Sequence, residues 1–407
     1  MTSVEDALRI FFEALPPTRL ETVTSSLPSA LNRVLAEDVT AKTNLPRFDK
    51  AAVDGYAVKA IDSVDATDLE PRTLQITTGK TIDSKQAKQV WTGKPIPRGA
   101  NAVVMLENIK QVRNNITIWN PLTPGENISK TGEDVQKGEI VLKAGARLKP
   151  QHLGLLSSLG MDTVNVFRKP KISILATGNE IVELGRKLGK YQVFDVNRLL
   201  LSSLCQELGV EPLDFGIAKD DVCEISEKLK SALKRSDAVL TSGGTSVGGS
   251  DLVPDAINRI GKPGIIVHGM AIRPAMPTAL AVVLDKPVII LPGNPVAAMI
   301  GFEVFAMPLI GKLLGLTNVE SRSLLNAKAS KGFATTLGRK SYVRVRVSKR
   351  GNEFFAEPIS TRGSSRISTM TKANGYVVVP ESREGIQKGE LVLVQLFDSI
   401  EMGNPHV

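Results

Sequence analysis

The chain has 407 residues, of which 42% are hydrophobic and 23% are charged. This composition is typical of a soluble globular protein with about two to three domains. The formal net charge of +9 favours anionic ligands. Aromatic residues make up only 4% and no long block of Lys and Arg occurs, so a nucleic-acid partner is the least expected.

Cysteine and histidine usage argues against a disulfide framework or a zinc site. Cys205 and Cys223 are the only cysteines, and His152, His268 and His406 form no ligand pattern. We therefore expect a reducing compartment, the cytoplasm. The N-terminus shows no signal-peptide pattern, and Pro, Gly or a charge interrupts each apolar run before membrane-spanning length, so no membrane partner is expected.

The N-terminal part of the chain predicts a docking helix followed by strand-rich structure. Apolar residues at helical spacing follow a capping-box pair, Ser3 and Asp6, and the helix is expected to end at Pro16. Strand-like patterns with glycine and proline turns extend over residues 69–118. A short helix is expected over residues 151–159, since proline precedes it and glycine follows it.

From Lys169 onward, strands alternate with helices, which is typical of a mostly parallel sheet. Ligands gather at the carboxyl ends of such strands. The predicted strands cover residues 171–176, 210–218, 238–240, 265–267, 279–284 and 288–291. Four helices are predicted. The first begins at Asp195 or Asn197 and ends at about Leu208, the second follows Asp221 and ends at about Lys234, the third begins at Pro254, and the fourth extends from about Val296 to Leu314.

A loop rich in glycine and hydroxyl groups follows the strand at residues 238–240. Glycines bring backbone N–H groups close to a ligand, and hydroxyls add further donors, so the loop suits a phosphate that arrives with a divalent cation. It carries neither a Walker nor a dinucleotide fingerprint, and a tight turn without a ligand is the alternative interpretation. The loop contains Ser242, Gly243, Gly244, Thr245, Ser246 and Asp251.

Acidic residues follow several of the predicted strands. Glu180, Asp220 and Asp251 each lie just beyond a strand end, so the sheet would bring them to one rim. Carboxylates on one rim repel each other unless a cation lies between them, and Mg²⁺ prefers such oxygen ligands. Some of these acids can instead cap the following helices, which is the interpretation we prefer for Asp221.

Basic residues beyond the acidic rim are candidates for oxyanion binding. Arg273 follows another predicted strand and can clamp an oxyanion or form a surface ion pair. From about Ser321 the chain is rich in β-branched residues and predicts a small all-β domain. Alternation over residues 342–347 places Arg344 and Arg346 on one face, which we expect to be solvated.

Several ordered stretches, which together span nearly the whole chain, resemble one family, the MoeA-type molybdopterin molybdenumtransferases, which include the E domain of gephyrin. The stretches are Leu45-Pro, Asp54-Gly-Tyr-Ala, Thr92-Gly-x-Pro-Ile-Pro-x-Gly-Ala, Gly132-Glu-Asp, Thr177-Gly-x-Glu, Asp195-x-Asn-Arg, Asp220-Asp, Ser242-Gly-Gly-Thr-Ser-Val-Gly with Asp251, and Leu291-Pro-Gly-Asn-Pro-Val. The resemblance implies that adenylylated molybdopterin and molybdate react to give molybdenum cofactor and AMP, assisted by Mg²⁺.

The resemblance also implies a multidomain α/β-plus-β fold. A parallel α/β pterin-binding domain like that of the MoaB and Mog proteins would cover residues 169–320. An inserted β-rich domain (44–134), an elongated linker domain (1–43 and 135–168) and a C-terminal β-barrel (321–407) would complete the chain. The family further implies a homodimer, and the adenylyltransferase of the same pathway would be a further partner.

The site residues follow by matching the family motifs. The catalytic residues would be Asp54, Glu180, Asp220 and Asp251, the last three being metal ligands. In the dimer, Asp54, Thr92 and Asp134 would come from the partner subunit. The substrate-binding residues would be Thr92, Asp134, Ser242, Gly243, Gly244, Thr245, Ser246, Arg273, Pro292, Gly293, Asn294, Pro295 and Ser364.

The chain departs from the family pattern in two stretches. Arg273-Pro-Ala-Met-Pro277 stands where the family usually has a glycine and a second cation, and Asn179 stands where it often has Asp. Such changes suit a paralogue with altered metal or pterin preference, for which tungstate is an alternative to molybdate. A non-catalytic molybdopterin carrier or scaffold on the same fold is the alternative function, and a nucleotide-processing enzyme that shares only the α/β domain is less favoured.

Overall fold

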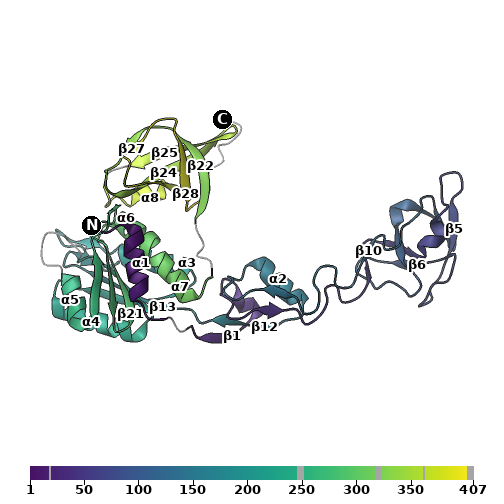
Figure 1. Ribbon diagram of the computed structural model, residues 1–407, viewed down its shortest axis with the longest axis horizontal. Helices are drawn as coiled ribbons and strands as arrows, with labels where there is room; N and C mark the ends of the chain where they lie inside the picture. The colour runs from purple at the N-terminus through teal and green to yellow at the C-terminus, as the bar shows by residue number, and fades with distance from the viewer. Residues whose placement is uncertain (18–19, 245–251, 318–321, 361–362, 401–407) are drawn as a thin grey trace. The chain divides into compact units, whose positions relative to one another are not determined.

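The computed structural model describes residues 1–17, 20–244, 252–317, 322–360 and 363–400 (Figure 1). The chain divides into two compact units. The α/β unit comprises Met1–Val23, Asn32–Val34 and Phe167–Val407. The strand-rich unit comprises Thr24–Leu31 and Leu35–Val166.

A mixed sheet of six strands forms the centre of the α/β unit. Its first four strands pair in parallel, and the last two are antiparallel additions at one edge. This confirms the mostly parallel sheet expected from the alternation of strands and helices. In spatial order the strands are β16 (Glu211–Ala218), β13 (Lys171–Thr177), β17 (Ala238–Ser242), β21 (Lys286–Leu291), β20 (Ala279–Val283) and β18 (Pro263–His268).

Helices cover both faces of this sheet because successive strand residues point to opposite sides. On β13, Ile174 packs into one hydrophobic cluster with α3 (Asn197–Glu207), and Leu175 packs into the other with α4 (Val222–Arg235). Helix α5 (Leu252–Ile260) joins the second cluster beside α4. Each fully buried Leu or Ile side chain contributes about 1.5–3 kcal/mol, so both faces hold the sheet in place.

Helix α1 (Val4–Ala14) also packs on the α/β core. The predicted cap is present, since the Asp6 N–H donates to Ser3 Oγ at 3.1 Å. The buried side chains of Val4 and Phe11 lie in the same cluster as α3. The family resemblance implies that residues 1–43 belong to the linker domain, whereas Met1–Val23 belong to the α/β unit and the apolar face of α1 joins its core.

The predicted helix over residues 296–314 forms in three segments, α6 (Pro295–Gly301), a π-helical turn (Phe302–Ala306) and α7 (Met307–Leu314). The Met307 N–H donates to the Phe302 carbonyl, five residues back. Among the described residues, Pro295–Leu314 is the one helix long and apolar enough to cross a membrane, but 72% of it is buried inside the protein. It is therefore a core helix.

The C-terminal part of the α/β unit is a closed β-barrel, as expected. Its strands follow the order β24-β25-β22-β28-β26, and β26 pairs back onto β24. A short strand from the α/β sheet region, β19 (Ile272–Arg273), pairs in parallel with the start of β24. The barrel strands are β22 (Ser323–Ala329), β24 (Lys340–Arg350), β25 (Glu353–Ser360), β26 (Gly375–Val379) and β28 (Leu391–Leu396).

The strand-rich unit contains a second six-stranded sheet and one α-helix, α2 (Pro150–Ser158). The sheet buries Tyr56, Leu74 and Ile116 in one cluster. The β-rich structure predicted for this region is therefore present. In spatial order its strands are β7 (Ala102–Met105), β4 (Gly55–Val58), β6 (Gln86–Val90), β5 (Arg72–Ile76), β9 (Asn115–Ile118) and β8 (Ile109–Val112).

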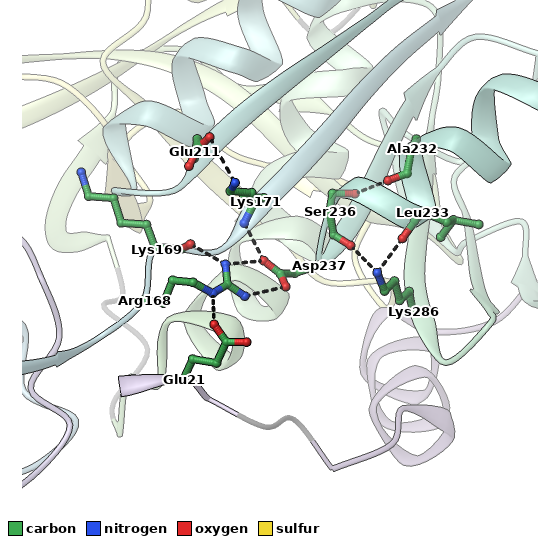
Figure 2. Close-up of polar contacts among 10 residues, drawn as sticks. All are labelled: Glu21, Arg168, Lys169, Lys171, Glu211, Ala232, Leu233, Ser236, Asp237 and Lys286. Carbon is green, nitrogen blue, oxygen red and sulfur yellow. Dashed lines mark hydrogen bonds and ion pairs between the residues drawn. The ribbon is translucent and has the colours of Figure 1, made fainter. Parts of the chain in front are cut away.

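A polar cluster anchors the start of the central strands in the α/β unit (Figure 2). Two guanidinium nitrogens of Arg168 donate to the Asp237 carboxylate at 2.9 and 3.1 Å, and the Lys171 N–H donates to it at 2.6 Å. Arg168 also donates a hydrogen bond to the Glu21 carboxylate at 2.8 Å. These bonds raise the pKa of Arg168, chiefly through Asp237. Asp237 thus joins the segments before β13 and β17.

We expect Asp237→Ala to destabilise the protein by about 2–3 kcal/mol, because it removes the charge-assisted bonds from Arg168 and Lys171 and takes their shared acceptor away. Differential scanning calorimetry of the full chain measures this loss. Glu211→Ala is the matched control, since Glu211 and Lys171 form a pair 3.9 Å apart whose side chains are both nearly half exposed. Such a surface pair contributes roughly 0–1 kcal/mol. Equal losses in the two variants would contradict the anchoring role of Asp237.

Candidate functional site

A cavity of about 950 Å³ opens at the carboxyl ends of β13, β17 and β21. Its lining includes most of the predicted residues of the α/β unit, brought together from separate loops. Asp251, Thr245 and Ser246 lie outside the described residues. The predicted residues in the lining are Glu180, Asp220, Ser242, Gly243, Gly244, Pro292, Gly293, Asn294 and Pro295.

Glu180 and Asp220 bring two carboxylates to this cavity. One oxygen of Asp220 accepts the Asn179 N–H at 3.1 Å, and the Asp220 N–H donates to the Asn179 side chain at 3.2 Å. The Asn at position 179 therefore orients Asp220. Asp221 takes the capping role that we preferred for it, accepting the Glu224 N–H at 2.8 Å.

The described residues contain no group of three or more His, Cys, Asp or Glu side chains placed to hold a metal ion. Mg²⁺ is commonly bound by only one or two carboxylates together with substrate phosphates. Glu180 and Asp220, which line one cavity, fit that mode of binding. The predicted metal site stays a prediction, since its third member, Asp251, is not among the described residues.

The turn after β17 needs glycine for steric reasons. Gly243 and Gly244 have φ angles of +97° and +68°. A Cβ on Gly243 would lie 2.4 Å from the Thr177 carbonyl oxygen, and one on Gly244 would lie 2.5 Å from the Val253 side chain. The chain thus bends tightly between β13 and α5, and both glycines line the cavity.

Gly243→Ala should therefore remove ligand binding and lower stability by more than about 2 kcal/mol, since the left-handed cost of roughly 1–2 kcal/mol adds to a backbone clash. Thermal unfolding with and without ligand measures both effects. The matched control is Gly269→Ala, because Gly269 has a similar φ of +82° but open space around the added methyl. A Gly243→Ala protein no less stable than the control would contradict the steric argument.

A second cavity of about 360 Å³ adjoins the first and shares Pro277, Pro292 and Asn294 with it. The barrel strand β24, its preceding loop and the segment at β19 supply its basic residues. The predicted residues Arg273 and Ser364 both line it. This cavity therefore combines cations and hydroxyl groups beside the carboxylate-bearing one.

Three arginines, Arg273, Arg339 and Arg344, line this second cavity. The Arg273 guanidinium donates to the Thr336 hydroxyl. Arg344 is only 4% exposed, and burial lowers the pKa of its guanidinium. Our expectation that Arg344 lies on a solvated face was wrong, because its side chain is buried where β24 lines this cavity.

The unusual Arg273-Pro-Ala-Met-Pro277 segment forms one wall of the second cavity. Ala275 adopts a φ of +87°, a conformation that favours glycine. Met276 places a thioether where the family usually has a cation. The cations of this cavity therefore come from Arg273 and from the barrel.

The remaining predicted residues, Asp54, Thr92 and Asp134, lie in the strand-rich unit. One oxygen of Asp54 accepts the Thr92 N–H at 2.7 Å and its hydroxyl at 2.8 Å. These bonds lower the pKa of Asp54, and the bond from the Thr92 backbone N–H has the larger effect. Asp54 is thus a carboxylate that Thr92 orients and helps to keep ionised.

The comparisons with known proteins cover nearly all of the chain. Residues 2–160 match the family model described as "MoeA N-terminal region (domain I and II)". Residues 173–312 match "Probable molybdopterin binding domain", and residues 326–397 match "MoeA C-terminal region (domain IV)".

Similar proteins match this chain over 90% or more of both sequences. A protein of Haemophilus influenzae named molybdopterin molybdenumtransferase is 32% identical over 98% of this chain and 100% of its own. A Bacillus subtilis protein of the same name is 32% identical over 93% of this chain and 90% of its own.

A crystal structure of a molybdopterin biosynthesis MoeA protein from Pyrococcus horikoshii is 31% identical, with a TM-score of 0.84. It covers 98% of this chain and 100% of its own. The fold and the order of the three matched regions lead to the same family, and the cavity at the strand ends agrees with it. The chain belongs to the MoeA family of molybdenum cofactor biosynthesis proteins.

Proposed function

We propose that this protein inserts molybdate into adenylylated molybdopterin and releases AMP. The observation that carries the proposal is the pair of adjoining cavities, one lined by Glu180, Asp220 and a donor-rich turn, the other by three arginines. The two cavities share the lining residues Pro277, Pro292 and Asn294, so an oxyanion bound in one would lie beside a pterin bound in the other. The names of the full-length relatives support the same activity.

The two cavities suit different parts of the reaction. Molybdate is a tetrahedral dianion, and arginines with adjacent hydroxyl groups can neutralise and orient it. The Ser242 hydroxyl and the turn at Gly243 and Gly244 suit the phosphate of the pterin. Positioning both substrates within reach of each other lowers the barrier to their reaction without a nucleophile from the protein.

Glu180 and Asp220 would hold Mg²⁺ together with substrate oxygens, and the ion supplies Lewis-acid polarisation of the adenylate linkage. In the proposed reaction, water cleaves the bond that joins AMP to the pterin phosphate. The two pterin thiols bind molybdenum and one oxygen leaves as water, so molybdenum keeps its oxidation state. No redox partner is needed.

We also propose a homodimer in which the partner subunit supplies Asp54, Thr92 and Asp134 to the site. In support, the segment over residues 184–199, next to the first cavity, exposes an unusual number of large apolar side chains. An exposed apolar surface of this kind is typical of protein interfaces. Its exposed members are Leu184, Leu188, Tyr191, Val193, Phe194, Val196 and Leu199.

The test incubates purified protein with adenylylated molybdopterin, Mg²⁺ and molybdate, and follows AMP. Release of AMP with formation of active cofactor is the expected result. Tight pterin binding with no AMP release would instead favour a carrier or scaffold. Tungstate replaces molybdate in a parallel reaction, and the adenylyltransferase of the pathway can be added as the source of substrate. We expect the reaction in the cytoplasm.

A further inference from the structure

Asn197 is the first residue of α3, yet it does not cap that helix. The capping role belongs to Asp195, whose side chain accepts the Arg198 N–H at 3.1 Å. The Asn197 amide nitrogen donates instead to Ser242 Oγ at 2.6 Å and to the Gly293 carbonyl at 2.8 Å. One amide group therefore ties the end of β17 to the loop after β21, the two segments that line the first cavity.

The orientation of this amide follows from its partners. The Gly293 carbonyl can only accept a hydrogen bond, so the NH₂ group of Asn197 must face it. Asn197 is 7% exposed and lines the cavity. Within the described ranges its other atom, Oδ1, is buried without a hydrogen-bond partner. An unpaired buried acceptor costs about 1–3 kcal/mol, so a donor from a bound ligand would be stabilising here.

The same contact sets the role of the Ser242 hydroxyl. Because Ser242 Oγ accepts a hydrogen from Asn197, its own O–H must point elsewhere. The Pro292 carbonyl is 3.5 Å away, at the limit of hydrogen bonding. The hydroxyl is therefore left as a donor for an anion in the cavity.

We infer that Asn197 is a positioning residue for phosphate binding. It fixes Ser242 as a hydrogen-bond donor to the phosphate of the pterin and holds the Gly293 loop next to Ser242. Its own Oδ1 is offered to a hydrogen-bond donor of the same ligand. This inference rests on the proposed function in that molybdopterin is taken as the ligand. The contact is local, so it can be tested on binding as well as on turnover.

The test measures the Kd of molybdopterin by isothermal titration calorimetry, and KM and kcat in the AMP-release assay, on the full-length protein. Asn197→Ala and Ser242→Ala should each weaken molybdopterin binding by about 10-fold or more, the loss expected for a hydrogen bond to a charged group. Gln206→Ala, which removes an exposed amide further along α3, is the matched control and should bind as the wild type does.

The double variant separates positioning from general destabilisation. If Asn197 acts through Ser242, the double variant Asn197→Ala/Ser242→Ala should have a Kd for molybdopterin no higher than that of the single variant with the higher Kd. This is expected because the two residues support one contact. Additive losses would overturn the inference, as would wild-type affinity in Asn197→Ala. Should the alanine variant not fold, Asn197→Asp keeps the shape but accepts the Ser242 proton, and it should bind at least as weakly as Ser242→Ala.

The outcomes also distinguish this inference from the proposed function. A wild-type protein that binds molybdopterin but releases no AMP would reject the proposed reaction, while the binding defects would still decide the role of Asn197. A wild-type protein that turns over normally, with an equally active and equally tight-binding Asn197→Ala variant, would reject the inference alone.

Discussion

An equal mixture of Asp54→Ala and Asp220→Ala subunits should recover about a quarter of the wild-type rate of AMP release, although each variant alone is inactive. Removing a catalytic carboxylate typically costs about 10²–10⁴-fold in rate. In a symmetric dimer with random assembly, about half of the dimers are mixed, and each of these has one intact site out of two. Recovery requires that Asp54 and Asp220 of one site come from different subunits.

The experiment can also be done by co-expressing the two variants with different affinity tags. The mixed dimer purified by both tags should then reach about half of the wild-type rate, since one of its two sites is intact. The matched control combines Glu180→Ala with Asp220→Ala, because both residues line the same cavity of the α/β unit. That mixture should stay inactive. A mixed Asp54→Ala and Asp220→Ala dimer that also stays inactive would show that each site is built within one chain, and the proposed role of the partner subunit would fall.

The sheet and the position of the first cavity could be predicted from the sequence because both follow from local rules. Short apolar runs marked β13, β17 and β21, and parallel strands collect their following loops at one edge. This places Glu180 and Asp220 beside the turn at Ser242 without any knowledge of long-range contacts. The cap at Asp221 was equally local, since it needs only the first turn of α4.

The second cavity could not be predicted in this way. Its arginines come together because the two-residue strand at Ile272 and Arg273 pairs with Lys340 and Ser341 on β24. A pairing this short leaves no periodic pattern in the sequence. Arg344 therefore looked like a solvated residue on an alternating strand, and only the packed barrel shows that it is buried.

Asn197 was missed for a different reason. An Asn or Asp near a predicted helix start is usually a cap, and the sequence offered two such residues. The structure assigns the cap to Asp195 and sends the Asn197 amide across to Ser242. The local pattern cannot distinguish these roles because the partner lies 45 residues further along the chain.

Arg344→Met should remove the stabilisation of the protein by molybdate and raise the KM for molybdate by roughly 10- to 150-fold, the equivalent of about 1.5–3 kcal/mol for a lost bond to a charged group. The side chain is 4% exposed and lines the arginine-rich cavity, so its charge acts on a ligand with little screening by water. Thermal unfolding across a molybdate titration measures the first effect, and the AMP-release assay measures the second.

The same substitution should leave the ligand-free protein nearly as stable as the wild type, which separates loss of binding from loss of folding. Burial lowers the pKa of Arg344, which means that the fold disfavours its charge, and an apolar side chain of similar length avoids that cost. Arg346→Met is the matched control, because it lies two positions along β24 on an exposed part of the strand. If both Arg344→Met and Arg339→Met bind molybdate as tightly as the wild type does, the arginine-lined cavity is not the molybdate site.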